Sequence, residues 1–280
     1  MSMKPQRQSN WQEILIECKD NVRRSIQPYL KTIREPQPNL GMGAGGDVIK
    51  PMDLAAESAI VDTLNHNGVS FTLISEESGV KRFGDSVDEC FVTADPIDGS
   101  TNFMRGLPFY ACSVAVSDKP WLNDVYAGIV ADLLRNVSYT AFKGKGAFRD
   151  GKNIEPTKNV FLDDALIGLD LNTYKVKEVA PRVTDLIGKT KHIRHFGANA
   201  LELCYVADGS TDAFVDLRGK LRSTDVAAGF LIIKEAGGII TTPDNQVVNI
   251  DLDPKRTLSF IASGNIQIHE KILSLVRRPC

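Results

Sequence analysis

The 280-residue chain lacks the long apolar runs that membrane proteins and secreted precursors carry. No stretch approaches the roughly 20 apolar residues of a transmembrane helix, and the N-terminus has no apolar signal core. There is also no run of lysines and arginines long enough to follow a phosphate backbone, and the formal net charge is −2. We therefore expect neither a membrane nor a nucleic acid as a partner.

Cysteine and histidine are too few and too scattered to suggest a disulfide framework or a zinc site. The five cysteines, at positions 18, 90, 112, 204 and 280, are odd in number and show no CxxC spacing. Most of them fall in apolar runs, so we expect buried free thiols and a reducing, cytoplasmic location. His192 and His195 are close in sequence, but their basic neighbours indicate a solvated edge.

Short apolar segments alternate with helical patterns along the chain, which has enough hydrophobic residues (42%) to bury a full core. The segments 110–117, 125–131 and 136–142 have no long helix between them, which indicates a largely antiparallel sheet. A first helix should begin near residue 10, where Asn10 and Glu13 resemble a capping box, and should be interrupted at Pro28. We expect further strands near 70–74, 90–94, 165–170, 212–216, 237–241 and 258–262, and further helices near 53–64, 176–188, 197–208, 225–236 and 266–277.

The most informative segment is Asp95-Pro-Ile-Asp98-Gly-Ser-Thr-Asn-Phe103, which directly follows the expected strand 90–94. Two carboxylates at a strand end, followed by small residues with free backbone N–H groups, can bind a hard cation on one side and phosphate on the other. The alternative is a simple turn, because Asp-Pro and Asp-Gly are common turn formers.

Three further acidic positions favour a site. Glu76 and Glu77 end the strand 70–74, where adjacent carboxylates repel each other unless solvent or a cation neutralises them. Asp53 and Glu57 form an acidic edge at the start of a helix, and Asp225 opens another helix, where a first-turn acid is ordinary. Taken together, acids that end two strands and open two helices match the way open α/β sheets build sites at strand ends.

The order of these motifs resembles that of the inositol monophosphatase family, and most closely its archaeal branch, which also hydrolyses fructose 1,6-bisphosphate. The likeness runs from about residue 11 to the C-terminus and includes the hairpin 144–151 and the stretch 197–204. It implies an α/β (α+β) fold, a five-layered αβαβα sandwich, with an N-terminal half, 1–150, that carries most metal ligands. The C-terminal half, 151–280, would carry Asp225 and the substrate-facing residues. A homodimer is usual in the family.

The resemblance also implies a Mg²⁺-dependent phosphomonoesterase that acts on inositol 1-phosphate, fructose 1,6-bisphosphate or both by direct attack of water. Two or three Mg²⁺ ions are expected in each site. One ion would be held by Asp95, Glu76 and the carbonyl of Ile97, a second by Asp95, Asp98 and Asp225, and a weaker third, or its waters, by Asp53. Glu76 and Ser100 would orient the attacking water with support from Glu77, and the amides of Gly99 and Ser100 would bind the phosphate.

On the substrate side, the resemblance implies contacts from Asp98, Asn199 and Asp216. The basic cluster Arg218, Lys220 and Arg222 is interpreted either as a site for a second phosphate or as plain surface charge. Two departures from the family pattern are Ser100 in place of threonine and Thr224 in place of tryptophan. The second departure argues against a narrow inositol-phosphate specialist.

Two other functions remain as hypotheses. One is a phosphatase acting on adenosine 3′,5′-bisphosphate, which we disfavour because no aromatic pair near Asp225 would clamp a base. The other is a metal-binding regulatory protein without turnover, against which the complete set of acids argues. The segment 41–46 matches GxGxxG but follows no buried strand, so a dinucleotide site is not indicated, and we expect a mobile lid there.

Overall fold

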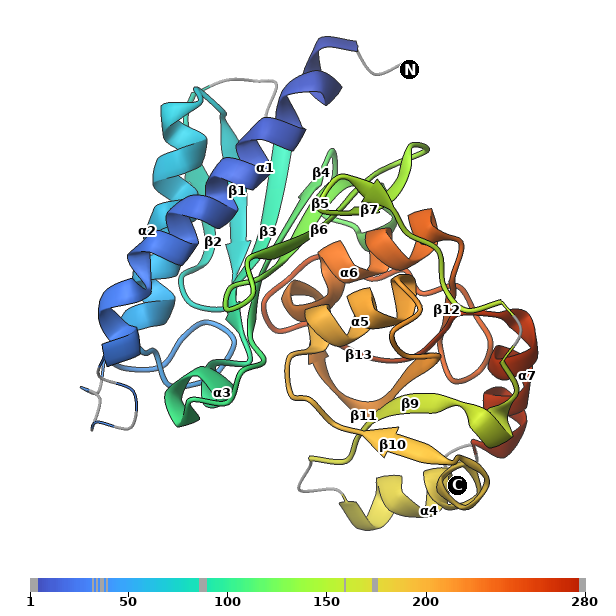
Figure 1. Ribbon diagram of the computed structural model, residues 1–280. Helices are drawn as coiled ribbons and strands as arrows, with labels where there is room; N and C mark the ends of the chain where they lie inside the picture. The colour runs from blue at the N-terminus through green and yellow to red at the C-terminus, as the bar shows by residue number, and fades with distance from the viewer. Residues whose placement is uncertain are drawn as a thin grey trace.

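Three layers of helices alternate with two mixed β-sheets (Figure 1). The computed structural model describes residues 5–31, 33, 35, 38, 40–85, 90–158, 160–172 and 176–276, and of residues 5–10 the backbone alone. Helices α1 and α2 cover the outer face of the first sheet, α5 and α6 lie between the sheets, and α4 and α7 cover the outer face of the second. This arrangement confirms the predicted five-layered αβαβα sandwich.

The helices have the following bounds. They are α1 (Pro5–Ser25), α2 (Pro51–His66), α3 (Ser100–Arg105), α4 (Val176–Lys189), α5 (Asn199–Ala207), α6 (Ser223–Ala236) and α7 (Ile266–Leu275), with 3-10 turns at Gln27–Lys31, Leu122–Asp124 and Leu162–Asp164. Helix α1 starts earlier than the capping pattern at Asn10 suggested, and it ends before the 3-10 turn that contains Pro28. No helix among the described residues is long and apolar enough to cross a membrane.

The first sheet has eight strands in the order β2-β1-β3-β4-β5-β6-β7-β8. All neighbours pair antiparallel except β1 and β3, so the prediction of a largely antiparallel sheet is confirmed. The strands are β1 (Phe71–Ser75), β2 (Gly79–Phe83), β3 (Cys90–Asp98), β4 (Ala111–Ser117), β5 (Val125–Asp132), β6 (Val137–Phe142), β7 (Gly146–Arg149) and β8 (Lys152–Asn153). The sequence patterns did not predict β2, whose middle residues are exposed.

The second sheet has five strands in the order β10-β9-β11-β13-β12, with β9 parallel to both of its neighbours. They are β9 (Leu166–Asp170), β10 (His192–Arg194), β11 (Ala213–Arg222), β12 (Ile239–Thr241) and β13 (Thr257–Ser263). The segment interpreted as a solvated edge is the edge strand β10, and His192 is exposed there. The first sheet uses residues 71–153 and the second 166–263, whereas the division of the chain at residue 150 stays a prediction.

Three separate apolar cores fill the spaces between the five layers. The first joins α1 and α2 to the first sheet, the second surrounds α5 and α6, and the third lies under α4 and α7. Helix α6 is buried on nearly all sides because residues 226–233 are all apolar or small, which suits a helix packed between two sheets. Cys18, Cys90, Cys112 and Cys204 are buried free thiols, as expected, and Cys280 lies outside the described residues.

A substitution in the central core should show how closely α6 packs on the first sheet. A Cβ atom added at Gly128 of β5 would lie 3.2 Å from the Cβ of Ala228 in α6. We therefore expect Gly128→Leu to lower the free energy of unfolding by roughly 2–3 kcal/mol. Gly188 in α4 has open space around its Cα, so Gly188→Ala should raise stability by about 0.5 kcal/mol. Urea denaturation of both variants tests this contrast, and equal stabilities would contradict it.

Candidate metal centre and active site

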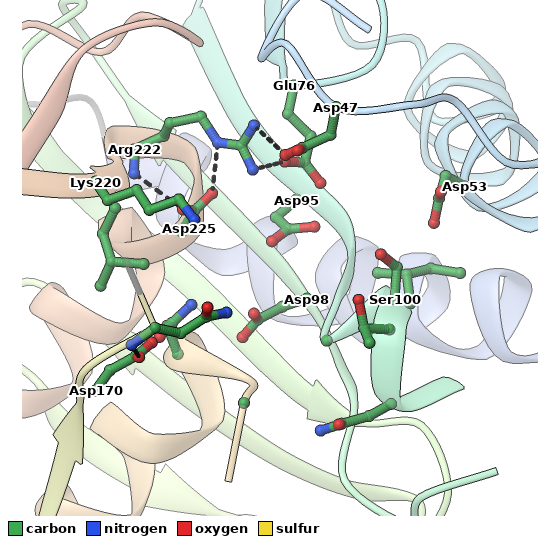
Figure 2. Close-up of a pocket in the computed structure, with 18 of the residues that line it drawn as sticks. Asp47, Asp53, Glu76, Asp95, Asp98, Ser100, Asp170, Lys220, Arg222 and Asp225 are labelled. Atoms are coloured by element: carbon green, nitrogen blue, oxygen red, sulfur yellow. Dashed lines mark hydrogen bonds and ion pairs between the residues drawn. The ribbon is translucent and has the colours of Figure 1, made fainter. Parts of the chain in front are cut away.

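Side chains from both sheets and from the starts of two helices line one cavity of about 400 Å³ (Figure 2). Glu76 lies in the turn after β1, and Asp95 and Asp98 lie at the end of β3. Asp53 lies in the first turn of α2, and Asp225 lies in the first turn of α6. The cavity is also lined by Ile97, Gly99, Ser100, Asn199, Arg218 and Lys220, so every predicted site residue except Asp216 reaches it.

Asp95 and Asp98 line the same cavity because β3 contains a bulge. In a regular strand, residues three positions apart would face opposite sides of the sheet. In the pairing with β4, however, Asp95 lies opposite Ser113 and Asp98 opposite Ala111, so β3 uses one residue more than its partner. Pro96 is tolerated there because a bulge accommodates a residue without a backbone N–H. The bulge therefore converts two carboxylates of one strand into neighbours in one site.

Glu76, Asp95 and Asp225 form the compact part of the site. Each offers one carboxylate oxygen, and the three oxygens lie within 4.8 Å of one another. Burial, together with the charges of neighbouring acids, raises the pKa of Glu76 to about 7 and raises that of Asp95 well above its usual value. Oδ1 of Asp95 is buried without a hydrogen-bond partner. A buried, oxygen-only group of acids with an unused oxygen fits a hard divalent cation such as Mg²⁺.

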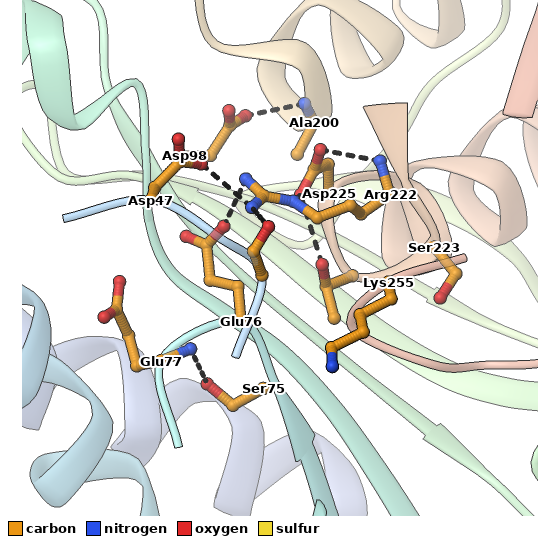
Figure 3. A network of polar contacts seen from close by, with 12 residues as sticks. Asp47, Ser75, Glu76, Glu77, Asp98, Ala200, Arg222, Ser223, Asp225 and Lys255 are labelled. Atoms are coloured by element: carbon orange, nitrogen blue, oxygen red, sulfur yellow. Dashed lines mark hydrogen bonds and ion pairs between the residues drawn. The ribbon is translucent and has the colours of Figure 1, made fainter. Parts of the chain in front are cut away.

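Asp98 connects the site to the middle helix layer. Its Oδ2 accepts a hydrogen bond of 2.7 Å from the backbone N of Ala200, in the first turn of α5 (Figure 3). The favourable dipole of the helix start and this bond both suit a carboxylate at this position. Burial and the charge of Asp225 nevertheless raise the pKa of Asp98 well above its usual value. Asp98 lies beside the three-acid group, and its role as a metal ligand stays a prediction.

Asp53 is positioned by an unusual helix start. Lys50 is the N-cap of α2 and Pro51 occupies the first helical position, where no backbone N–H is needed. Asp53 is 3% exposed with its Oδ1 unpartnered, and burial raises its pKa to about 6 against the lowering effect of Lys50. Glu57 has a different role from Asp53, since its Oε2 accepts from the backbone N of Ser78 at 3.3 Å and it does not line the cavity.

Gly99 must be a glycine for two reasons. Its φ is +86°, in the left-handed region, and an added Cβ would lie 3.0 Å from the carbonyl oxygen of Gly197. This tight turn starts α3 directly after β3 and places Ser100 at the cavity. The Nζ of Lys50 donates to the Oγ of Ser100 at 2.6 Å, so the hydroxyl group is held from the side of α2.

Asp216 and Arg218 lie differently from what the sequence suggested. Asp216 is 0% exposed, and its Oδ1 and Oδ2 accept from the backbone N and the Nε of Arg218. The guanidinium of Arg218 also pairs with Asp170 at 2.5 Å, and its side chain is only 4% exposed. This geometry does not support a contact between Asp216 and substrate hydroxyls. Two carboxylates pair with the guanidinium of Arg218, so it is not a plain surface charge, and its role in receiving a second phosphate stays a prediction.

Asp170 is one of the cavity residues that our sequence analysis missed, and His195, interpreted as part of a solvated edge, is another. Asp170 is the last residue of β9 and lies opposite Asp216 in the parallel pairing of β9 and β11. The rule that singled out Asp95, an acid at a strand end, applied equally to this position. His195 lies nearby, with its Nε2 3.7 Å from Oδ1 of Asp170, and lines the cavity together with Asn199 and the exposed Lys220.

Glu202 of α5 supports the wall of the cavity from behind. Its Oε1 accepts from the backbone N atoms of Phe196 and Gly197, at 3.2 and 3.0 Å. Its Oε2 is buried and has no hydrogen-bond partner. Burial raises the pKa of Glu202 to about 7, against the lowering effect of the two backbone bonds. Burial thus favours the neutral form of this carboxyl group over the charged one.

The fold and the site together define a class of α/β proteins in which acidic residues from different layers form a site that could hold a metal ion. The model of the inositol monophosphatase family matches residues 9–279, and the chain belongs to this family. The resemblance of the motifs is thus confirmed. The family consists of phosphomonoesterases that depend on a divalent metal, and the group of Glu76, Asp95 and Asp225 could bind such an ion.

Individual relatives agree over almost the whole chain. The fructose-1,6-bisphosphatase/inositol-1-monophosphatase of Methanothermobacter thermautotrophicus is 36% identical over 94% of this chain and 95% of its own. The bifunctional NADP phosphatase/NAD kinase of Methanococcus maripaludis is 34% identical over 94% of this chain but only 48% of its own. The crystal structure of an inositol monophosphatase–fructose 1,6-bisphosphatase superimposes with a TM-score of 0.83, at 32% identity, covering 95% and 99% of the two chains.

Replacing Glu202 should change how stability depends on pH. Because burial raises the pKa of Glu202 to about 7, we expect the folded protein to keep this proton at pH values where the unfolded chain, with an ordinary pKa of 4.5, has lost it. The stability that this proton contributes is complete below the unfolded pKa and is lost as the pH rises through the folded one, by about 3 kcal/mol.

Glutamine at position 202 keeps an oxygen that accepts from Phe196 and Gly197 but cannot ionise. Between about pH 4.5 and pH 7.5, the free energy of unfolding of the wild type should therefore fall relative to that of Glu202→Gln. Urea denaturation at several pH values measures this difference. A difference that stays constant would show that Glu202 is ionised in the folded protein.

Proposed function

We propose that this protein is a Mg²⁺-dependent sugar-phosphate phosphatase that hydrolyses inositol 1-phosphate, fructose 1,6-bisphosphate or both. The observation that carries the proposal is the convergence of Glu76, Asp95 and Asp225, whose oxygens lie within 4.8 Å of one another in a cavity that also contains the turn at Gly99. The substrates are those in the names of relatives that match over the full chain. The metal supplies Lewis acidity and a lowered pKa for bound water.

The residues of the site divide into ligands and groups that bind or orient the substrate. Asp95, Glu76 and the carbonyl of Ile97 would hold one ion, Asp98 and Asp225 a second, and Asp53 a third or its waters. Free backbone N–H groups of Gly99 and Ser100 would bind the phosphate. On the far side of the cavity, Asn199 and Lys220 remain candidates for contacts with the sugar or a second phosphate, now joined by Asp170 and His195.

Ser100 and Glu76 would orient the attacking water, with support from Glu77. Since Lys50 donates to the Oγ of Ser100, the proton of this hydroxyl group is directed elsewhere, and the remaining lone pair can accept from a water molecule. Glu76 is the nearest candidate to receive the proton of that water. Glu77 also lines the cavity, and burial and the charge of Asp53 raise its pKa to about 8, which suits a supporting role as a proton donor.

A nucleotide substrate is the second candidate. It is favoured by the 34% identity with a protein named as an NADP phosphatase and NAD kinase, which this chain matches over 94% of its own length. The homodimer and the two-part division of the chain at residue 150 are parts of the proposal that rest on the family alone. The cytoplasmic location is also supported by the buried free thiols.

A phosphate-release assay should distinguish these functions. With Mg²⁺ we expect turnover of inositol 1-phosphate or fructose 1,6-bisphosphate well above that of NADP and adenosine 3′,5′-bisphosphate. Chelation should abolish it, and high Mg²⁺ or Li⁺ should inhibit it, because a site with several ions must release one before phosphate leaves. Preference for NADP would favour the second candidate, and no turnover of any substrate would favour a binding protein. Full activity in chelator would overturn the metal mechanism.

Asp98→Asn should abolish turnover without unfolding the protein. The amide loses the charge that attracts Mg²⁺ but keeps an oxygen that can accept from the N of Ala200. The exposed Asp118 provides a matched control, and Asp118→Asn should leave activity unchanged. If Asp98→Asn retained more than about a tenth of wild-type activity, a change of only ~1.4 kcal/mol in the barrier, Asp98 would not be a metal ligand.

A further inference from the structure

Arg222 joins three segments of the chain that lie far apart in the sequence (Figure 3). It is the N-cap residue of α6, and its backbone N donates to Oδ2 of Asp225 at 2.9 Å. Its Nη2 lies 2.6 Å from Oε2 of Glu76, and its Nη1 donates to Oδ2 of Asp47 at 2.9 Å and to the carbonyl of Gly45 at 3.1 Å. One guanidinium thus contacts α6, the end of β1 and the glycine-rich loop 41–47.

The loop 41–47 is folded onto the residues that follow β1. The backbone N of Ala44 donates to the carbonyl of Glu77 at 3.1 Å, and that of Gly45 donates to the carbonyl of Glu76 at 2.7 Å. A Cβ at Gly45 would lie 2.3 Å from Nη1 of Arg222, and a Cβ at Gly43 would lie 2.9 Å from the carbonyl oxygen of Glu76. These glycines therefore make room for the guanidinium and the close backbone contact, beyond any freedom they give to a lid.

The guanidinium shares carboxylates with the cation centre. Glu76 and Asp225 belong to the three-acid group, and both are also partners of Arg222, whose side chain is 16% exposed. A divalent ion bound to the same carboxylates would be repelled by the guanidinium at short range and would compete with it for their charge. Any contact that holds Arg222 in place must therefore oppose metal binding, and by reciprocity metal binding must weaken that contact.

We propose that Arg222 is a positioning residue that couples the loop 41–47 to the metal centre: it anchors the loop through Asp47 and Gly45 and, as a competing cation on Glu76 and Asp225, limits the affinity for Mg²⁺. The inference rests on the metal site of the proposed function. It gives the loop a direct energetic link to metal occupancy. Asp47, whose side chain is 80% exposed, also lines the cavity and helps to raise the pKa of Asp53. Removing its charge should weaken Mg²⁺ binding through this direct route and strengthen it through the release of Arg222, and we expect the second effect to be larger.

A double-mutant cycle on Arg222 and Asp47 tests this coupling. Isothermal titration of the full chain with Mg²⁺ should show about tenfold tighter binding for Arg222→Gln, and about threefold tighter binding for Asp47→Asn, because Arg222 is then easier to displace. The double variant should bind no more tightly than Arg222→Gln. Arg222→Lys keeps the competing charge and should stay close to the wild type in affinity. Arg256→Gln, at a surface ion pair, is the control and should change nothing.

Hydrogen exchange provides a second measurement that does not depend on turnover. The amides of Ala44 and Gly45 should exchange faster in Arg222→Gln, Arg222→Lys and Asp47→Asn than in the wild type, since each loses part of the anchor. A purely structural arginine would instead give weaker Mg²⁺ binding when it is removed. Unchanged or weaker binding in Arg222→Gln would overturn the coupling.

The outcomes separate this inference from the function on which it rests. A wild-type protein that binds no Mg²⁺ would overturn both. A wild type that binds Mg²⁺, with variants that bind it equally well, would overturn the coupling alone. If Arg222→Gln failed to fold, Asp47→Asn would decide the question, because its exposed side chain can be replaced without disturbing the core. Unchanged affinity in Asp47→Asn would then overturn the inference.

Discussion

Mutual repulsion among buried carboxylates is the constraint on which the rest of this structure depends. Asp53, Asp95, Asp98 and Asp225 are all at most 5% exposed, and they face one cavity with Glu76. Carboxylates at such positions either take up protons or require positive charge nearby. Arg222 and Lys50 supply positive charge beside this group. They are fewer than the five carboxylates, and divalent cations suit the negative charge that remains. Near this group, the negative charges of Asp170 and Asp216 need no metal, because Arg218 pairs with both carboxylates.

The layers of the fold bring these charges together from distant parts of the chain. The first sheet contributes the ends of β1 and β3, while α5 and α6, between the sheets, contribute the contact of Ala200 with Asp98 and the position of Asp225. The second sheet contributes Asp170 and the side chains around it. Asp95 and Glu76 thus come from the first sheet, whereas Asp170 and Lys220 come from the second, so one side of the cavity can vary without rearranging the other. This separation is consistent with relatives of one fold whose names differ in substrate.

Local signals at strand ends and helix starts predicted most of the elements and most of the acids, whereas the five-layered arrangement was predicted by the resemblance to the family. The expected segments correspond to β1, β3–β6, β9, β11–β13 and to all helices except α3 as an independent element. What these signals missed depends on pairing between strands. The register of β9 against β11 places Asp170 and Asp216 side by side, and Arg218 pairs with both, although only Asp170 lines the cavity. Likewise, the role of Arg222 depends on a loop more than a hundred residues away.

Because β3 contains a bulge, the site depends on the number of residues between Asp95 and Asp98. Asp95 and Asp98 share a side of the sheet only because a single additional residue lies between their partners on β4. Removing one residue between them would restore regular alternation and rotate everything after it, including the turn at Gly99 and the start of α3, by half a turn about the strand. A single substitution there changes one contact of the site, whereas an insertion or deletion between Asp95 and Asp98 would displace every residue that follows. The nearby surface hairpins carry no such limit, so changes in chain length should accumulate in them and not between these two aspartates.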